Sequence, residues 1–334
     1  MPDNRQTEKS FASVLKENWL KVVRNEHFAL GAILAGLIAV MTVRTGGAFL
    51  TATNIRSLLL RSSIRGIAAV GQAFVMLSAG IDLSVGGVAI LVSCLGASLM
   101  SESPRYAAHL PVALGVLIMV LVGIGLGASN GVMVSRFRMS PLIVTLAMWQ
   151  IGIGGAFQVT KEGETVRYLP ETLAFFGKGN IGGVPVPIII FVAAIVVGYL
   201  VLNHTSFGRS IYAVGGSEVT AMLSGIKVRN IRFLVYTICG LCAGIAGVIQ
   251  LSRIMAANTM VLYGLEIDSI AAVVIGGVSL FGGRGSIIGV LLGVLILGVV
   301  GNGMNLLGLT IYMQWMVRGG VILIAVVIDS LRRH

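Results

Sequence analysis

The sequence is poor in charged and aromatic residues. Charged side chains make up 11% of its 334 residues and aromatic ones 7%, whereas 56% are hydrophobic. A soluble globular protein has about 25% charged residues, so this chain has too little polar surface to cover a globule in water. The composition therefore excludes the ordinary classes of soluble enzyme and indicates a membrane protein with several spans, because each membrane helix needs about 20 mostly apolar residues.

Cysteine is scarce as well. The three cysteines, Cys94, Cys239 and Cys242, lie within apolar runs, so no disulfide framework is expected. Cys239 and Cys242 form a C-x-x-C pair, but without a second pair or a nearby histidine no metal or redox site is predicted. The sequence also lacks the phosphate-binding motif G-x-x-x-x-G-K-S/T and any cluster of catalytic side chains. Neither ATP hydrolysis by this chain nor an integral-membrane enzyme is predicted.

Long apolar runs dominate the sequence. Together with their polar breaks they predict an all-α integral membrane protein with about ten transmembrane helices. Glycine, at 45 residues, is about twice as frequent as usual, which suits close packing of these helices. The predicted spans cover residues 27–43, 57–79, 83–100, 110–134, 141–160, 185–203, 233–251, 267–282, 286–305 and 311–329.

Basic residues set the expected orientation. They number 24 against 13 acidic residues, for a net charge of +11, but they are spread over short connectors, so no nucleic-acid partner is expected. If both chain ends are cytoplasmic, the inside segments carry roughly twice as many basic residues as the outside segments, as the positive-inside rule requires. The prediction is a cytoplasmic tail over 1–26 without a cleaved signal peptide, a transmembrane domain over 27–330 and a cytoplasmic end over 331–334.

Two connectors are long. Residues 161–184 are predicted to form the main external loop, and residues 204–232 the main cytoplasmic loop. The cytoplasmic loop has two short amphipathic segments, 209–214 and 218–224, on either side of Gly215 and Gly216. This pattern predicts a helical hairpin at the membrane surface.

The two halves of the sequence share short motifs. Asn-Ile-Arg occurs at 54–56 before the second span and at 230–232 before the seventh, and an Ile-Asp pair marks the third and eighth spans at 81–82 and 267–268. Because these spans differ by five, an odd number, two five-helix halves would be inverted copies, as in many transporters. Glycines four residues apart predict flat packing faces at Gly123, Gly127 and Gly131, at Gly240 and Gly244, and at Gly285, Gly289 and Gly293.

Five charged residues fall within or beside the predicted spans: Arg61, Arg65, Asp82, Asp268 and Arg318. A charged group in a bilayer is costly unless it is paired or hydrated. Asp82 and Asp268 lie near span ends, where either capping of a helix start or the lining of a transport path explains them. Arg61 and Arg65 share a helical face, from which they can reach lipid headgroups.

Four segments together form a recognisable pattern. They are residues 79–87 (AGIDLSVGG), 140–146 (SPLIVTL), 208–216 (GRSIYAVGG) with 223–226 (LSGI), and 279–286 (SLFGGRGS) with 301–308 (GNGMNLLG). In this order and spacing, the sequence resembles the permease subunits of bacterial monosaccharide ATP-binding-cassette importers, the ribose, xylose and galactoside branch. The resemblance extends from about residue 46 to residue 329.

The resemblance implies a subunit of the bacterial inner (plasma) membrane that performs no covalent chemistry. Its expected partners, besides the lipid bilayer, are a second permease copy or paralogue, a cytoplasmic ATPase with two nucleotide-binding halves, and a periplasmic substrate-binding protein. No cofactor or metal is expected on this chain, because the ATPase uses the ATP and Mg. The motion of the ATPase is expected to reach the permease through the cytoplasmic loop.

The resemblance also implies which residues couple to the ATPase. They are Gly208, Arg209, Tyr212, Gly215, Gly216, Glu218, Ala221, Leu223 and Gly225. The stretch departs from the family pattern at Val219 and Thr220, where relatives often have an acidic residue and an alanine, so the ATPase contact at these two positions is expected to differ. We still expect Glu218, Ala221 and Gly225 to fit into the cleft of the ATPase.

Polar side chains in apolar spans are the candidates for the substrate path, although each also suits a hydrogen bond between helices. They are Asp82, Asn130, Gln150, Asn302 and Asn305, with Trp149 and Trp315 as aromatic candidates. The predicted function is the permease subunit of an importer for a monosaccharide or related polyhydroxy compound. The alternative is a self-sufficient secondary transporter of a small polar solute, which inverted halves would also fit.

Overall fold

The computed structural model describes residues 26–331, and the fold over this range is almost entirely helical. The predicted tail 1–26 and the predicted end 331–334 lie, except for one residue each, outside the described residues. The elements are α2 (Glu26–Arg44), η1 (Ala48–Leu50), α3 (Ala52–Leu77), α4 (Val85–Met100), α5 (Val112–Ser135), α6 (Pro141–Val159), η2 (Glu171–Ala174), α7 (Phe175–Lys178), β1 (Asn180–Ile181), β2 (Val184–Pro185), α8 (Val186–His204), α9 (Ser206–Gly216), α10 (Glu218–Leu223), α11 (Val228–Ile254), α12 (Leu265–Ile275), α13 (Ile287–Leu306) and α14 (Ile311–Leu331).

Each of the ten predicted spans contains a helix. Seven of these helices, α2, α3, α5, α6, α8, α11 and α13, are long and apolar enough to cross a membrane. Helix α4 and the apolar part of α14 are shorter. The all-α, multi-pass class of fold is therefore confirmed.

Helix α12 differs from the span predicted over 267–282. It has 11 residues, which at 1.5 Å per residue make about 16 Å, roughly half of the hydrocarbon core of a bilayer. Four glycines soon after its end, Gly277, Gly282, Gly283 and Gly285, have positive φ angles between 72° and 129°, which a continuing helix does not allow. Residues 276–286 form an irregular connector instead, so the predicted span is too long and Gly285 is not part of the glycine face of α13.

Glycine contacts join α5 to α11. A Cβ atom on Gly123 would lie 2.7 Å from the carbonyl oxygen of Gly240, and one on Gly127 would lie 2.5 Å from that of Tyr236. These distances are shorter than a real Cβ contact, so the two backbones touch only because glycine has no side chain. The predicted packing faces on these two helices are confirmed.

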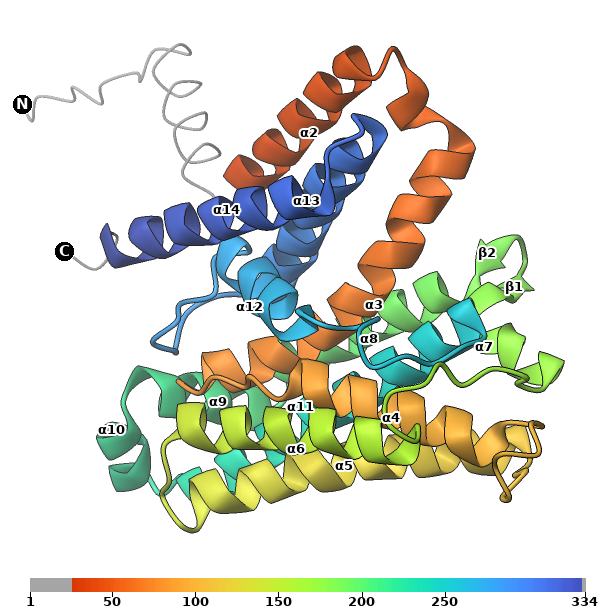
Figure 1. Ribbon diagram of the computed structural model, residues 1–334. Helices are drawn as coiled ribbons and strands as arrows, with labels where there is room; N and C mark the ends of the chain where they lie inside the picture. Colours follow the sequence, from red (N-terminus) through yellow and green to blue (C-terminus); the bar gives the residue numbers. More distant parts are fainter. Residues whose placement is uncertain (1–25, 332–334) are drawn as a thin grey trace, which may run out of the picture.

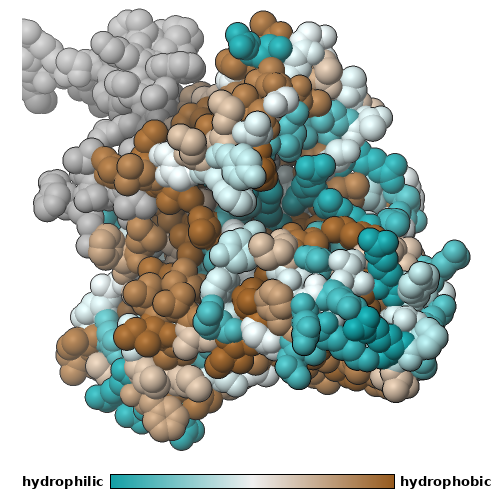
Figure 2. Space-filling model, in the orientation of Figure 1, coloured by the Kyte–Doolittle hydropathy of each residue, from teal (hydrophilic) through white to brown (hydrophobic). Residues whose placement is uncertain are grey.

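Two opposite ends of the molecule carry the loops. Figure 1 shows α9 and α10 in the left half of the view, together with the start of α2 and the end of α14. The antiparallel pair β1–β2 and the short helix α7 lie at the right. Figure 2 shows hydrophilic side chains gathered over the right side, and apolar side chains over the helices farther left. The connectors 161–184 and 204–232 thus lie at opposite ends of the helical body.

Candidate functional site

A polar pocket of about 200 Å³ lies among α3, α11, α12, α14 and the loop that precedes α12. Figure 2 shows hydrophilic side chains reaching into the hollow between the upper helices and the lower ones. Most of the lining side chains are polar or charged, although the surrounding helices are apolar. The polar lining residues are Arg61, Arg65, Gln250, Arg253, Tyr263, Asp268 and Arg318.

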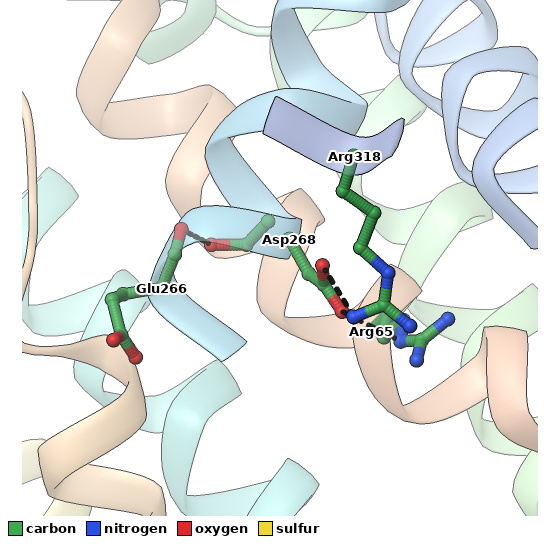
Figure 3. A network of polar contacts seen from close by, with 5 residues as sticks. Arg65, Glu266, Asp268 and Arg318 are labelled. Atoms are coloured by element: carbon green, nitrogen blue, oxygen red, sulfur yellow. Dashed lines mark hydrogen bonds and ion pairs between the residues drawn. The ribbon is translucent and has the colours of Figure 1, made fainter. Parts of the chain in front are cut away.

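Asp268, on α12, forms ion pairs with residues of two other helices inside this polar pocket (Figure 3). Its Oδ2 atom lies 3.0 Å from Nε of Arg65, on α3, and its Oδ1 atom lies 3.3 Å from Nη1 of Arg318, on α14. The side chains of all three residues are between 14% and 28% exposed. A single carboxylate shared by two partly buried guanidinium groups holds both arginines toward the pocket.

This geometry bears on the alternatives for Asp268 and for the two arginines of α3. Asp268 lies in the first turn of α12, whose N-cap position is Gly264 and has no side-chain cap. Its side chain lines the pocket and does not cap the helix. Arg61 and Arg65 do share a face of α3, as predicted, but Arg65 pairs with Asp268, so the lipid-headgroup interpretation is wrong for Arg65.

The substrate-path candidates Asp82 and Asn130 form a separate buried network. The Asp82 Oδ1 atom accepts hydrogen bonds from the backbone N–H of Ser84 at 2.8 Å and from its hydroxyl at 2.6 Å. Asn130 donates to the same hydroxyl at 2.8 Å. Asp82 and Asn130 are at most 1% exposed, and the network links the start of α4 to α5. Neither residue lines the polar pocket.

The other candidates lie in four different places. Asn302 donates to Asn54 at 2.9 Å, and Asn305 accepts from Gln314 at 2.9 Å. Both line a small cavity of about 20 Å³ that shares Arg61, Arg65 and Arg318 with the polar pocket. Gln150 is exposed on α6. Of the two aromatic candidates, Trp149 packs edge-on against the pocket residue Tyr263, at 5.8 Å between ring centroids, whereas Trp315 is exposed.

Sequence reasoning missed part of this pocket. Arg253, Gln250 and Tyr263 were not singled out, because each stands at or beyond the end of a predicted span. The sequence analysis did identify Arg61, Arg65 and Arg318, because a charged group in a bilayer is costly. All three line the pocket. No group of His, Cys, Asp or Glu residues that could hold a metal ion occurs within residues 26–331.

Helices α9 and α10 form the hairpin predicted in the loop 204–232. The hydroxyl of Thr205 caps α9 by accepting from the N–H of Gly208 at 3.1 Å, and that of Ser217 caps α10 by accepting from the N–H of Thr220 at 3.2 Å. Glu218 pairs with Arg232, on α11, at 2.7 Å. The caps and the ion pair fix the hairpin against the body of the protein.

The predicted coupling residues divide between the two faces of this hairpin. Gly208, Gly215 and Ala221 are buried, and Tyr212 and Glu218 are half-buried. Arg209, Gly216, Leu223 and Gly225 are exposed, and Gly225 ends α10 with a φ of 81°. Val219, Met222 and Leu223 form an exposed apolar face on α10, with Leu223 84% exposed. This apolar face covers nothing within the described chain and is available to a partner.

The inner face of α9 contacts the connector 276–286. The hydroxyl of Tyr212 donates to the carbonyl oxygen of Gly285 at 3.0 Å, and burial raises the pKa of this hydroxyl, which keeps it protonated as a donor. The N–H of Gly283 donates to the carbonyl oxygen of Leu77, at the end of α3, at 3.0 Å. Gly215 fits against both Leu77 and Gly283. The connector therefore links α9 to α12, which carries Asp268.

Comparison with known proteins gives the family. The model of the family described as "Branched-chain amino acid transport system / permease component" matches residues 54–326. The chain is 39% identical to a ribose import permease protein of Escherichia coli over 309 residues, which cover 91% of this chain and 94% of the relative.

Two other relatives agree with this assignment. A ribose import permease protein of Bacillus subtilis is 40% identical over 303 residues (90% of this chain, 92% of the relative). A D-allose transport system permease protein of Escherichia coli is 36% identical over 299 residues (90% of each chain). No solved structure matches the chain. The chain belongs to the family of branched-chain amino acid transport system permease components, and it is a multi-pass membrane permease rather than an enzyme.

Proposed function

We propose that this chain is the permease subunit of an ATP-binding-cassette importer that moves a monosaccharide or related polyhydroxy compound into the cytoplasm. The observation that carries the proposal is the similarity, over about nine-tenths of the chain, to permeases named for the import of ribose and D-allose. The importer would stand in the bacterial inner membrane, with both chain ends in the cytoplasm. Helix α12 and the connector 276–286 together would make one crossing, of which the helix covers about half.

The proposed partners follow from the two ends of the molecule. A cytoplasmic ATPase with two nucleotide-binding halves, which uses the ATP and Mg, docks on the exposed apolar face of α10 at Val219, Met222 and Leu223. A periplasmic binding protein delivers the cargo at the opposite end, near β1 and β2. A second permease copy or paralogue completes the membrane part.

The coupling mechanism follows from the contacts of α9. Movement of the ATPase displaces the hairpin α9–α10, and α9 transmits the displacement to the connector 276–286 through Tyr212 and Gly215. The connector moves α12 and therefore Asp268, whose ion pairs hold the polar pocket together. A packed, hydrogen-bonded chain of contacts of this kind can carry energy between two distant sites.

The substitution Leu223→Asp tests this function. It places a charge on the exposed face of α10 without disturbing the body of the protein, so the chain should insert and fold normally. We expect ATP-dependent uptake and co-purification of the ATPase to fall by at least about tenfold, as for the loss of a central interface contact. Ile181→Asp, an exposed apolar position at the opposite end, is the matched control for co-purification, because a charge there should leave the ATPase bound.

The rival secondary transporter makes the opposite prediction. If membrane vesicles without ATP accumulate the cargo with an ion gradient alone, and if Leu223→Asp has no effect on uptake, the proposal is wrong. Wild-type protein purified in mild detergent should instead retain a protein with two nucleotide-binding halves, identified by mass spectrometry.

A further inference from the structure

The polar pocket has a strong excess of positive charge. Four arginines and one aspartate line it, which leaves a net charge of +3. An uncharged sugar needs hydroxyl-directed hydrogen bonds and gains nothing from such an excess. Because arginine is costly inside a membrane, arginines that face a cavity there mark a path for a ligand of opposite charge.

The single carboxylate in the pocket is already occupied. Asp268 pairs with Arg65 and Arg318, whereas Arg61 and Arg253 have no acidic partner within residues 26–331. The nearest other acid along the chain, Glu266, is 6% exposed and points away from the arginines in Figure 3. Two guanidinium groups in the pocket therefore remain unneutralised by the described protein.

Helix α12 adds to the positive potential. Leu265 and Asp268, in its first turn, line the pocket, so the helix presents its N-terminal end there. The N-terminus of a helix carries about half a positive charge. In other transporters, half-length helices direct this end toward the anionic group of a substrate.

We propose that the polar pocket binds the oxyanion of an anionic sugar derivative, a sugar acid or a sugar phosphate, as the cargo of this importer. The inference rests on the proposed function and names its substrate class. Arg61 and Arg253 form charge-assisted hydrogen bonds to the carboxylate or phosphate, for which the guanidinium group is well matched. The pocket volume of about 200 Å³ suits a small solute.

The remaining lining residues suit the sugar part of the cargo. The amide of Gln250 can donate to and accept from hydroxyl groups. Tyr263 offers a hydroxyl and an aromatic ring, which packs edge-on against Trp149. The pocket thus combines an oxyanion site with partners for a polyhydroxy body.

The test uses pairs of probes that differ only in the oxyanion. The purified permease in a neutral detergent is titrated with D-galacturonate and D-ribose 5-phosphate, and with D-galactose and D-ribose, at equal ionic strength. Saturation-transfer NMR, which detects weak binding, should show binding of the anionic member of at least one pair and a weaker signal from its neutral partner. Equal signals within both pairs would overturn the inference.

Variants then locate the binding site. Arg61→Gln and Arg253→Gln each remove a charge that has no partner, so the protein should remain folded, and each should weaken binding of the anion by at least about fivefold. Arg56→Gln is the control, because Arg56 lies on the same helix but donates to Asn180 at 2.7 Å, outside the pocket. Anion binding that is unchanged in both variants contradicts the inference.

A lipid phosphate is the other source of an oxyanion. Titration with phosphatidylglycerol and phosphatidylcholine separates it from the cargo: if phosphatidylglycerol binds through Arg61 and no sugar anion does, the inference is overturned.

A different result would refute the proposed function, namely that no ATPase co-purifies with the wild-type permease. An importer that takes up only neutral sugars, at unchanged rates in Arg61→Gln, would keep the proposed function and refute the anionic cargo.

Discussion

Asp268 joins parts of the chain that are far apart in the sequence. Its two oxygens contact Arg65, about two hundred residues earlier, and Arg318, in the last helix. The ion pairs are partly buried, so water compensates little for the loss of one partner. The residue therefore determines both the charge of the polar pocket and the relative position of α3, α12 and α14.

Replacement of Asp268 by asparagine should destabilise the protein. Arg65 and Arg318 would then face one another without a carboxylate, and the free energy of unfolding should fall by about 3 kcal/mol. A thermal unfolding assay in detergent measures the change. The double variant Asp268→Asn with Arg318→Gln keeps the original net charge and should recover part of the loss. A single variant as stable as the wild type would show that these ion pairs do not hold the helices.

At the level of elements, α5 and α11 pack with their backbones in contact. The approach depends on Gly123 and Gly127 on one helix and on Gly240 on the other. Gly125, on the same helix α5, faces outward and has no atom within 4 Å of an added Cβ. Helix α5 therefore offers a glycine at the contact with α11, Gly127, and a control glycine outside it, Gly125.

The variant Gly127→Leu should separate α5 from α11. Its side chain would overlap the backbone of α11, and overpacking of this kind costs about 1–3 kcal/mol or more. Gly125→Leu should leave the thermal unfolding temperature within a degree or two, because surface changes usually stay within about 0.5 kcal/mol. Equal losses of stability in the two variants would contradict close packing at Gly127.

The sequence predicts the helices well because their signals are local. Apolar runs of about 20 residues and glycines four apart are read directly along the chain, and the capped hairpin α9–α10 was visible in its turn residues. The stop of α12 was missed, since the apolar character of 271–278 continues past the point where glycine backbone angles end the helix.

The candidate site was less predictable than the fold. The pocket combines residues from four helices, and nothing along the chain indicates that Arg253 faces Arg61 and Asp268. Two polar residues in apolar spans were predicted to line the substrate path but do not line this pocket. Gln150 is exposed on α6, and Asn130 is buried in a hydrogen-bonded network. Which side of a helix faces a cavity depends on tertiary packing.

For the whole molecule, the sidedness of the two ends can be measured directly. The native cysteines Cys94, Cys239 and Cys242 are at most 7% exposed, so the wild-type protein should not react with a membrane-impermeant maleimide. In cells that produce the permease without the ATPase, Ile181→Cys should be labelled in intact spheroplasts, and Leu223→Cys only after lysis, because the exposed positions lie at opposite ends. Labelling of Leu223→Cys from outside would reverse the proposed orientation.

The short length of α12 also bears on how a charged cargo would cross the membrane. Arg61, in the pocket at one end of α12, and Arg284, in the connector beyond its other end, are both exposed. The helix covers about 16 Å of a hydrocarbon core of about 30 Å, so the irregular connector 276–286 makes up the rest of this crossing. Movement of one negative charge inward against 100 mV, inside negative, costs about 2.3 kcal/mol. Import of the anionic cargo proposed above would therefore include electrical work of about this size for each negative charge.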